Sequence, residues 1–283
     1  MDAVNEKGWL ATSQPIAIFD SGEGGLTVLK RAWALYPGED FIYGADSSHF
    51  PYGSRSLDNV RELFLRFLDF FLDQHVKAVV IACNTATAAA LEEAQRRSPV
   101  PVIGVVDPGA HRAARLSSSG RIAVLSTYAT YQSEVYRYAI ARYNEGAQVV
   151  QHPCPVLVTM AESGDTDTEQ ARLAVRECLT TVFREDVDTV VLGCTHFPHM
   201  ERIFYQEVAG RAEIVDPGYE TAKHLTAVLG PLKQQEGGTM RFYTTGQTEE
   251  FDRISAVLWP GMTIRATALQ WRNGHYVEEK YES

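Results

Sequence analysis

The sequence predicts an α/β fold of two similar domains, each built on a parallel-type sheet flanked by helices. The first observation behind this prediction is that short apolar, β-branched runs lead directly into helix-forming segments. In residues 78–95, for example, AVVIAC is followed by NTATAAALEEAQ. Such runs are typical of strands that are buried on both faces, as in parallel sheets. The second observation is that this pattern returns further along the chain at a nearly constant separation.

The chain carries three pairs of matching segments. AVVIAC at 78–83 matches TVVLGC at 189–194, PVIGVVDPG at 101–109 matches AEIVDPG at 212–218, and IAIFDSGEGG at 16–25 is a weaker match to IAVLSTYAT at 122–130. The anchoring residues are Cys83 and Cys194, Asp107 and Asp216, and Asp20 and Ser126, which are 111, 109 and 106 residues apart. This spacing indicates two halves that are related by duplication or that share the same fold.

The two Asp-Pro-Gly segments suggest where the domains divide, because this tripeptide favours a turn and disfavours the continuation of a helix. We expect a first domain at 14–107 plus 216–283, a second at 108–215, and an N-terminal extension at 1–13.

Single elements can also be predicted. We expect a helix at 59–76, whose phenylalanines face the core, and a second helix at 223–229. We expect a loop at 117–120, and two strands at 240–246 and 262–269 that extend the first sheet.

Length and charge restrict the classes of function. The 283 residues suffice for two ordinary domains, and the composition of 45% hydrophobic and 22% charged residues is that of a soluble globular protein. A net charge of −10, from 26 basic and 36 acidic residues, disfavours a nucleic-acid surface or an anionic membrane as partner. No stretch approaches the roughly 20 apolar residues of a membrane span. The first 13 residues lack a signal-peptide pattern, so we expect a cytosolic protein.

The four cysteines, Cys83, Cys154, Cys178 and Cys194, include no C-x-x-C pair and do not indicate a disulfide framework, so we expect them to be reduced. Cys83 and Cys194 each follow a predicted strand, at the edge of the sheet where open α/β folds bind ligands. A thiol beside a helix N-terminus is easier to ionise. The alternative for Cys83 is a small core hydrophobe, the commoner fate of a free cysteine.

Two facing halves would bring Cys83 and Cys194 to opposite walls of one interdomain cleft. Inversion of a carbon centre needs a proton to leave one face and another to arrive on the opposite face, which two acid/base groups can perform. A Cα held about 3–3.5 Å from each sulfur would place the sulfurs roughly 6–8 Å apart, too far for a disulfide.

Asp20 and Ser21 begin a glycine-rich turn, DSGEGG, at another predicted strand end. The turn lacks the Lys-Ser/Thr of a P-loop, so nucleotide binding is disfavoured, and Ser21 with free turn amides could instead hold a carboxylate. His196 could hydrogen-bond a thiol or a substrate group. Two other classes stay open: a zinc site formed by Asp20, Cys83, Cys194 and His196, and a two-lobed binder that closes on acidic amino acids without chemistry.

Five motifs in this order, DSGEGGLTVL, DSSHFPYGSRS, ACNTATA, CPVLVTMAESG and GCTHFPH, resemble the glutamate racemases. The resemblance implies two pseudo-twofold related α/β domains, an active site in the cleft between them and no cofactor or metal. It implies that Cys83 serves D-glutamate and Cys194 serves L-glutamate, with Asp20 and His196 as their respective helpers. Substrate-binding positions carried over are Asp20, Ser21, Tyr52, Gly53, Asn84, Thr85, Thr195 and His196.

The resemblance also has departures. Glu23 stands where the motif usually has an apolar residue, which adds a negative charge near an acidic substrate. Asp46 and Glu162 match acidic positions of the family, but we interpret them as a turn-forming residue and a solvated residue. We expect Cys154 and Cys178 only to pack in the core.

The expected function is therefore that of a cofactor-independent glutamate racemase that supplies D-glutamate for bacterial peptidoglycan. Its partner is a small-molecule substrate, and a homodimer is left open. The alternative is a racemase of aspartate or another small acidic amino acid in the same superfamily.

Overall fold

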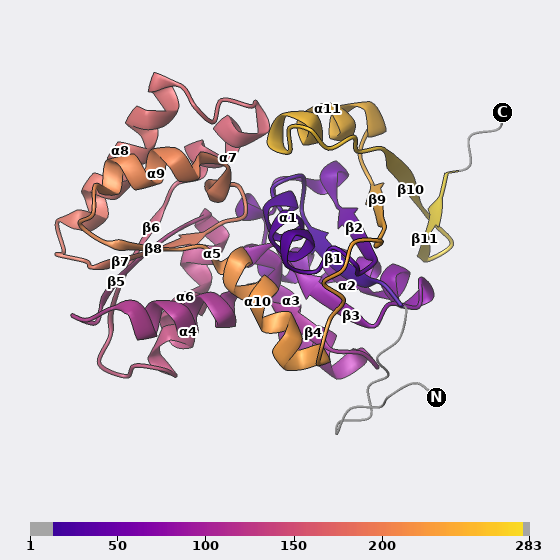
Figure 1. The fold of residues 1–283 in the computed structure, drawn as a ribbon, viewed down its shortest axis with the longest axis horizontal. Coiled ribbons are helices and arrows are strands. Elements are labelled where there is room, and N and C mark those ends of the chain that lie inside the picture. Colours follow the sequence, from indigo (N-terminus) through magenta and orange to yellow (C-terminus); the bar gives the residue numbers. More distant parts are fainter. Residues whose placement is uncertain (1–13, 280–283) are drawn as a thin grey trace.

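The computed structural model describes residues 14–279, which form two sheets with helices on both faces (Figure 1). The larger sheet has the strand order β11-β10-β9-β2-β1-β3-β4, and the smaller has the order β6-β5-β7-β8. The strands of the larger sheet are β1 (Ile16–Asp20), β2 (Phe41–Ala45), β3 (Ala78–Ile81), β4 (Val102–Gly104), β9 (Met240–Thr244), β10 (Ala266–Arg272) and β11 (His275–Glu278). Those of the smaller are β5 (Arg121–Ser126), β6 (Gln148–Pro153), β7 (Thr189–Gly193) and β8 (Glu213–Val215).

The two sheets repeat one arrangement. The order β2-β1-β3-β4 of the first half is the order β6-β5-β7-β8 of the second, and every pair within these two sets is parallel. Every residue of β1, β3 and β7 is buried, as expected for parallel strands covered on both faces. The α/β class and the repeat predicted from the three matching segments are confirmed.

Helices follow most of the strands and cover the sheets. They are α1 (Leu26–Leu35), α2 (Leu57–Asp73), α3 (Asn84–Arg97), α4 (Val106–Leu116), α5 (Tyr128–Ser133), α6 (Val135–Ala141), α7 (Pro155–Glu162), α8 (Glu169–Phe183), α9 (Glu201–Val208), α10 (Pro217–Leu229) and α11 (Thr248–Leu258), with short 3₁₀ turns η1 (Ser47–His49), η2 (Tyr52–Ser54) and η3 (Phe197–Met200). The predicted core-facing helix is α2, whose phenylalanines are buried and whose first turn is capped by the Ser56 side chain.

The two Asp-Pro-Gly segments do not form turns, and that prediction is wrong. Asp107, Pro108 and Gly109 lie in the first turn of α4, while Asp216 is the N-cap of α10 and accepts a hydrogen bond from the Gly218 amide. The physical reason is that proline is well tolerated in a helix's first turn, where its missing N–H has no partner to lose, and aspartate is a favoured N-cap.

The segment after α10 returns to the larger sheet, as predicted. β9 pairs with β2, and β10 pairs with β9, both in parallel, while β11 closes an antiparallel hairpin at the edge. In Figure 1, α10 lies between the halves, and it packs against both α1 and α4. We keep 14–107 plus 216–283 and 108–215 as proposed domain limits; the extension at 1–13 lies outside the described residues.

Cys154 and Cys178 form a disulfide, which corrects the expectation of four reduced cysteines. Cys154 directly precedes α7 and Cys178 lies on α8, and both are buried in one core cluster of the second half. Their Cα atoms are 6.3 Å apart, within the range that a disulfide requires. They do pack in the core, as predicted, but they are also bonded.

None of the helices in residues 14–279 has the length and apolar character needed to cross a membrane.

Candidate active site

Cys83 and Cys194 occupy equivalent places in the two halves. Cys83 lies two residues beyond β3 and Cys194 directly beyond β7, and these strands hold the same position in their sheets. Both thiols are buried and unbridged. A charge on Cys194 raises the pKa of Cys83 further, after the larger effects of burial and of Asp20, so the two sulfurs share one electrostatic environment. The predicted distance between them stays a prediction.

Cys83 is held at the start of α3 by local hydrogen bonds. As the N-cap residue its Sγ accepts from the Ala86 amide at 3.4 Å, and its S–H donates to Ser21 Oγ at 3.8 Å. Burial raises the pKa of this thiol well above its usual range, and the charge of Asp20 raises it further. Cys83 therefore carries its proton at neutral pH, and the expectation that the helix N-terminus makes this thiol easier to ionise is wrong because burial outweighs it.

Asp20, the last residue of β1, is fully buried and links the two halves. Its carboxylate accepts from the Gly22 amide at 3.2 Å and from the Thr195 hydroxyl of the second half at 3.2 Å. Burial raises the pKa of Asp20 to about 6, although the nearby His196 charge opposes the shift. A carboxyl with a pKa near neutrality can both accept and release protons, which is what a helper of a thiol requires.

His196 connects Cys194 to Glu162. Its Nδ1 lies 3.7 Å from Cys194 Sγ, and its Nε2 is hydrogen-bonded to Glu162 Oε1. Burial by itself would lower the pKa of His196, but Glu162 and Cys194 raise it well above its usual value. His196 is thus an imidazolium at neutral pH, and both ring nitrogens donate.

The interpretation of Glu162 as a solvated residue is wrong. Its side chain is 14% exposed, and it forms an ion pair with His196 from the last position of α7. Asp46 is likewise more than a turn former, because it is fully buried and accepts hydrogen bonds from Tyr52, His49 and Thr245.

The glycine-rich turn makes room for these side chains. A Cβ on Gly24 would lie 2.5 Å from the His196 ring, and a Cβ on Gly25 would lie 2.5 Å from Asp20 Cβ and 2.8 Å from the Tyr43 hydroxyl. Real contacts of this kind do not fall below 3.0 Å. The turn is therefore explained by close packing under the catalytic candidates, with no need for a phosphate.

The other predicted substrate-binding residues lie where the halves meet, and several of their side chains form hydrogen bonds within the protein. The Tyr52 hydroxyl donates to Asp46 at 2.6 Å, and Asn84 accepts from the Tyr136 hydroxyl of the second half at 2.6 Å. Thr85 shares hydrogen bonds with the hydroxyls of Thr127 and Thr130 at 3.0 and 3.1 Å.

Gly53 packs against the same second-half segment, since a Cβ there would lie 2.8 Å from Thr127. Sequence reasoning missed this contact, although Thr127 directly follows the strand end that matches Asp20 in the repeat.

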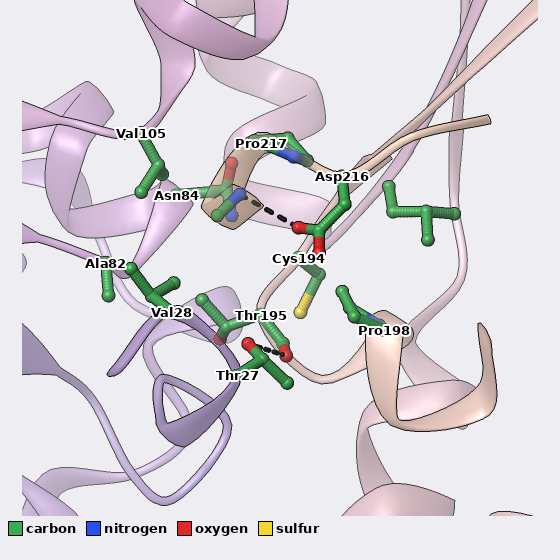
Figure 2. A pocket seen from close by; sticks show the side chains of 12 residues that line it. Thr27, Val28, Ala82, Asn84, Val105, Cys194, Thr195, Pro198, Asp216 and Pro217 are labelled. Atoms are coloured by element: carbon green, nitrogen blue, oxygen red, sulfur yellow. Dashed lines mark hydrogen bonds between the residues drawn. The ribbon is translucent and has the colours of Figure 1, made fainter. Parts of the chain in front are cut away.

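A small cavity lies between the two halves beside Cys194. Figure 2 shows side chains from both halves converging on it, with Val28 and Asn84 on one side and Cys194 and Pro198 on the other. The cavity that they line has a volume of about 10 Å³, enough for one water molecule. This cavity is too small to hold an amino acid.

The open zinc alternative gains no support from the geometry. In residues 14–279, one group of three metal-ligating side chains has its ligand atoms within 4.8 Å of one another, and this group, His152, Cys154 and Cys178, includes neither free thiol. There the two sulfurs are bonded to each other, so they are not free thiolates. Asp20, Cys83, Cys194 and His196 do not gather into such a group.

Several known proteins are similar to this chain in fold and sequence. The Asp/Glu/Hydantoin racemase family matches residues 28–225. The glutamate racemase of Symbiobacterium thermophilum is 45% identical over 88% of this chain and 92% of its own. A glutamate racemase isoform from Bacillus anthracis has a TM-score of 0.86 at 35% identity, over 91% of this chain and 97% of its own.

A Francisella tularensis glutamate racemase, solved in complex with D-glutamate, has a TM-score of 0.83 at 29% identity, over 91% of this chain and 98% of its own. With the same four-strand order in both sheets, a free thiol at the matching strand end of each, and this similarity over most of its length, the chain belongs to the glutamate racemase family, within the Asp/Glu/hydantoin racemases.

Proposed function

We propose that this glutamate racemase interconverts L- and D-glutamate by moving protons between Cα and two thiols, Cys194 and Cys83, with no cofactor. The observation that carries the proposal is the pair of buried, unbridged thiols at equivalent strand ends of the two repeated sheets. Each thiol has its own polar partner: Ser21 for Cys83, and His196 for Cys194.

From L-glutamate, the thiolate of Cys194 takes the Cα proton and becomes a thiol. The electron pair left on Cα is delocalised into the α-carboxylate, and the Cys83 thiol then delivers its proton to the opposite face. The product is D-glutamate, and the chain is left with Cys194 protonated and Cys83 as thiolate. The raised pKa of Cys83 supports its role as the donor in this direction, because it carries a proton at neutral pH.

The two helpers return the site to its starting protonation. Asp20, with a pKa raised to about 6 by burial, lies on the Cys83 side and can pass a proton toward that thiolate. The His196 imidazolium faces Cys194 Sγ and stabilises negative charge on it through the Nδ1–H donor. Reversal of these roles converts D-glutamate to L-glutamate.

Glutamate carboxylates would bind to main-chain amides and hydroxyls at the strand ends, from Ser21, Asn84, Thr85 and Thr195. The start of α3 supports this assignment, since its free N–H groups and positive dipole end favour an anion. The net charge of −10 is spread over the surface and screened, so it does not oppose a local anion site.

The relatives favour glutamate over aspartate as the substrate, because those reported above carry the name glutamate racemase. By family, the D-glutamate would serve peptidoglycan synthesis. A cytosolic location and a homodimer stay predictions.

The test is to incubate L-glutamate with the purified protein and to separate the enantiomers of glutamate over time. The proposal expects D-glutamate to approach equality with the L form, and aspartate to react far more slowly. A protein that binds glutamate but yields no D-enantiomer would be the two-lobed binder. Stoichiometric zinc, with activity lost to a chelator, would replace the two-thiol mechanism by the zinc alternative.

A further inference from the structure

Glu23 is a buried acid at the edge of the site. It lies in the turn between β1 and α1 and is only 3% exposed. Its Oε1 accepts a hydrogen bond from Ser47 Oγ at 2.9 Å. A single hydrogen bond from a hydroxyl does not offset the free-energy cost of burying an ionised carboxylate.

The glycines on either side of Glu23 contact the pair that holds Cys194. A Cβ on Gly22 would lie 3.5 Å from Glu162 Oε1, and one on Gly24 would lie against the His196 ring. Burial and the charge of Glu162 raise the pKa of Glu23, and a hydrogen bond between the two carboxyl groups raises it further. A hydrogen bond between two carboxyl groups requires one of them to be protonated, because an ionised carboxylate is only an acceptor.

The charges around this contact favour keeping that proton. Glu23, Glu162 and Asp20 are three acids gathered around the His196 imidazolium, with the Tyr43 hydroxyl packed on the same turn. If all three acids were ionised, the site would carry two uncompensated negative charges where it must bind an anionic amino acid. Burial, and then the charge of Glu162, raise the pKa of Glu23 to about 8.

We propose that Glu23 is a positioning residue, which shares one proton with Glu162 and so keeps a single negative charge beside the His196–Cys194 pair. The inference rests on the proposed racemase function and deepens it. Loss of the proton adds a second negative charge next to the substrate and pushes the two carboxylates apart. We therefore expect the KM for glutamate to rise about tenfold as the proton is lost, from the repulsion of one added charge at close range.

The direct test is infrared spectroscopy of the carbonyl stretch of protonated carboxylic acids, which does not depend on activity. At pH 7 the wild-type protein should show such a band, and titration should remove it as the pH rises through about 8. Glu23→Gln should lack the band, while its amide still donates to Glu162. The exposed residue Glu145 gives the matched control, since Glu145→Gln should leave the band unchanged.

A second variant should shift the pKa of Glu23 upward, an effect that lost packing alone would not produce. The Ser47 hydroxyl lowers the pKa of Glu23, so Ser47→Ala should keep the band, and the low KM, to higher pH than in the wild type. Glu23→Gln should remove the rise of KM around pH 8 altogether. An infrared band unchanged by Glu23→Gln, or an identical rise of KM in that variant, would overturn the proposal. Lack of racemisation by the wild-type protein would instead reject the proposed function, because the band reports the proton independently.

Discussion

Gly24→Ala should disable the site although it replaces no side chain that carries a proton in the proposed mechanism. An added Cβ would lie 2.5 Å from His196 Cε1 and Nδ1 and 2.8 Å from Nε2, whereas ordinary contact begins at 3.4 Å. The ring is 2% exposed and held at both nitrogens, so it has to move by about 1 Å, away from Cys194 Sγ or Glu162. A misplacement of this size costs about a hundredfold in rate, which corresponds to about 2.7 kcal/mol in the barrier.

The assay is the initial rate of change in optical activity of L-glutamate, with kcat and KM determined separately. Gly146→Ala is the matched control, because a Cβ there meets only Asn144 Oδ1 at an ordinary 3.6 Å. We expect kcat to fall in Gly24→Ala and to stay at the wild-type value in Gly146→Ala, with folded circular dichroism spectra for both. A kcat for Gly24→Ala within threefold of wild type would refute the idea that the glycine turn sets the position of the His196 ring.

Three further predictions concern protonation and the cysteines. Asp20→Asn should stabilise the protein by up to about 3 kcal/mol at pH 8, since the raised pKa of about 6 means that folding disfavours the ionised form. The gain should shrink as the pH falls below about 6 and vanish well below the ordinary value of 3.8, where Asp20 is protonated in both the folded and the unfolded state, and urea unfolding at high and low pH measures it. Glu162→Gln should lower the pKa of His196, observed by NMR titration of the imidazole, because Glu162 is the main group that raises it; an unchanged pKa would contradict the ion-pair assignment. Titration of thiols in denaturant should find two free thiols before reduction and four after it, whereas four at the outset would contradict the Cys154–Cys178 disulfide.

The strand ends of this protein are predictable from sequence. The short β-branched run Ala78–Ile81 favours a buried strand, and the helix-forming residues after it place Cys83 at the carboxyl edge of the sheet. The same pattern precedes Cys194, and the nearly constant separation of the matching segments predicts the repeated strand order. At these strand ends the local residue preferences agree with the fold, so a few neighbouring residues are enough to predict the structure.

Features that depend on contacts between distant segments are not predictable in this way. Glu162 lies in the segment AESGD, which is typical of an exposed helix end, and its burial comes from His196, 34 residues along the chain. The Cys154–Cys178 disulfide joins a strand end to a helix 24 residues on, with no local spacing signal. The Asp-Pro-Gly segments failed for another reason, because the same residues suit a turn and the first turn of a helix.

The most direct test of the two-thiol account follows hydrogen at Cα in deuterium oxide. Starting from L-glutamate, Cys194 should remove the Cα proton, and Cys83, whose thiol has exchanged with solvent, should deliver deuterium to the opposite face. At low conversion, D-glutamate should therefore be deuterated at Cα, while recovered L-glutamate should stay protiated; Cys83→Ala and Cys194→Ala should each abolish the conversion. Equal deuterium in substrate and product, or full activity in either variant, would indicate one base serving both faces and would contradict the account.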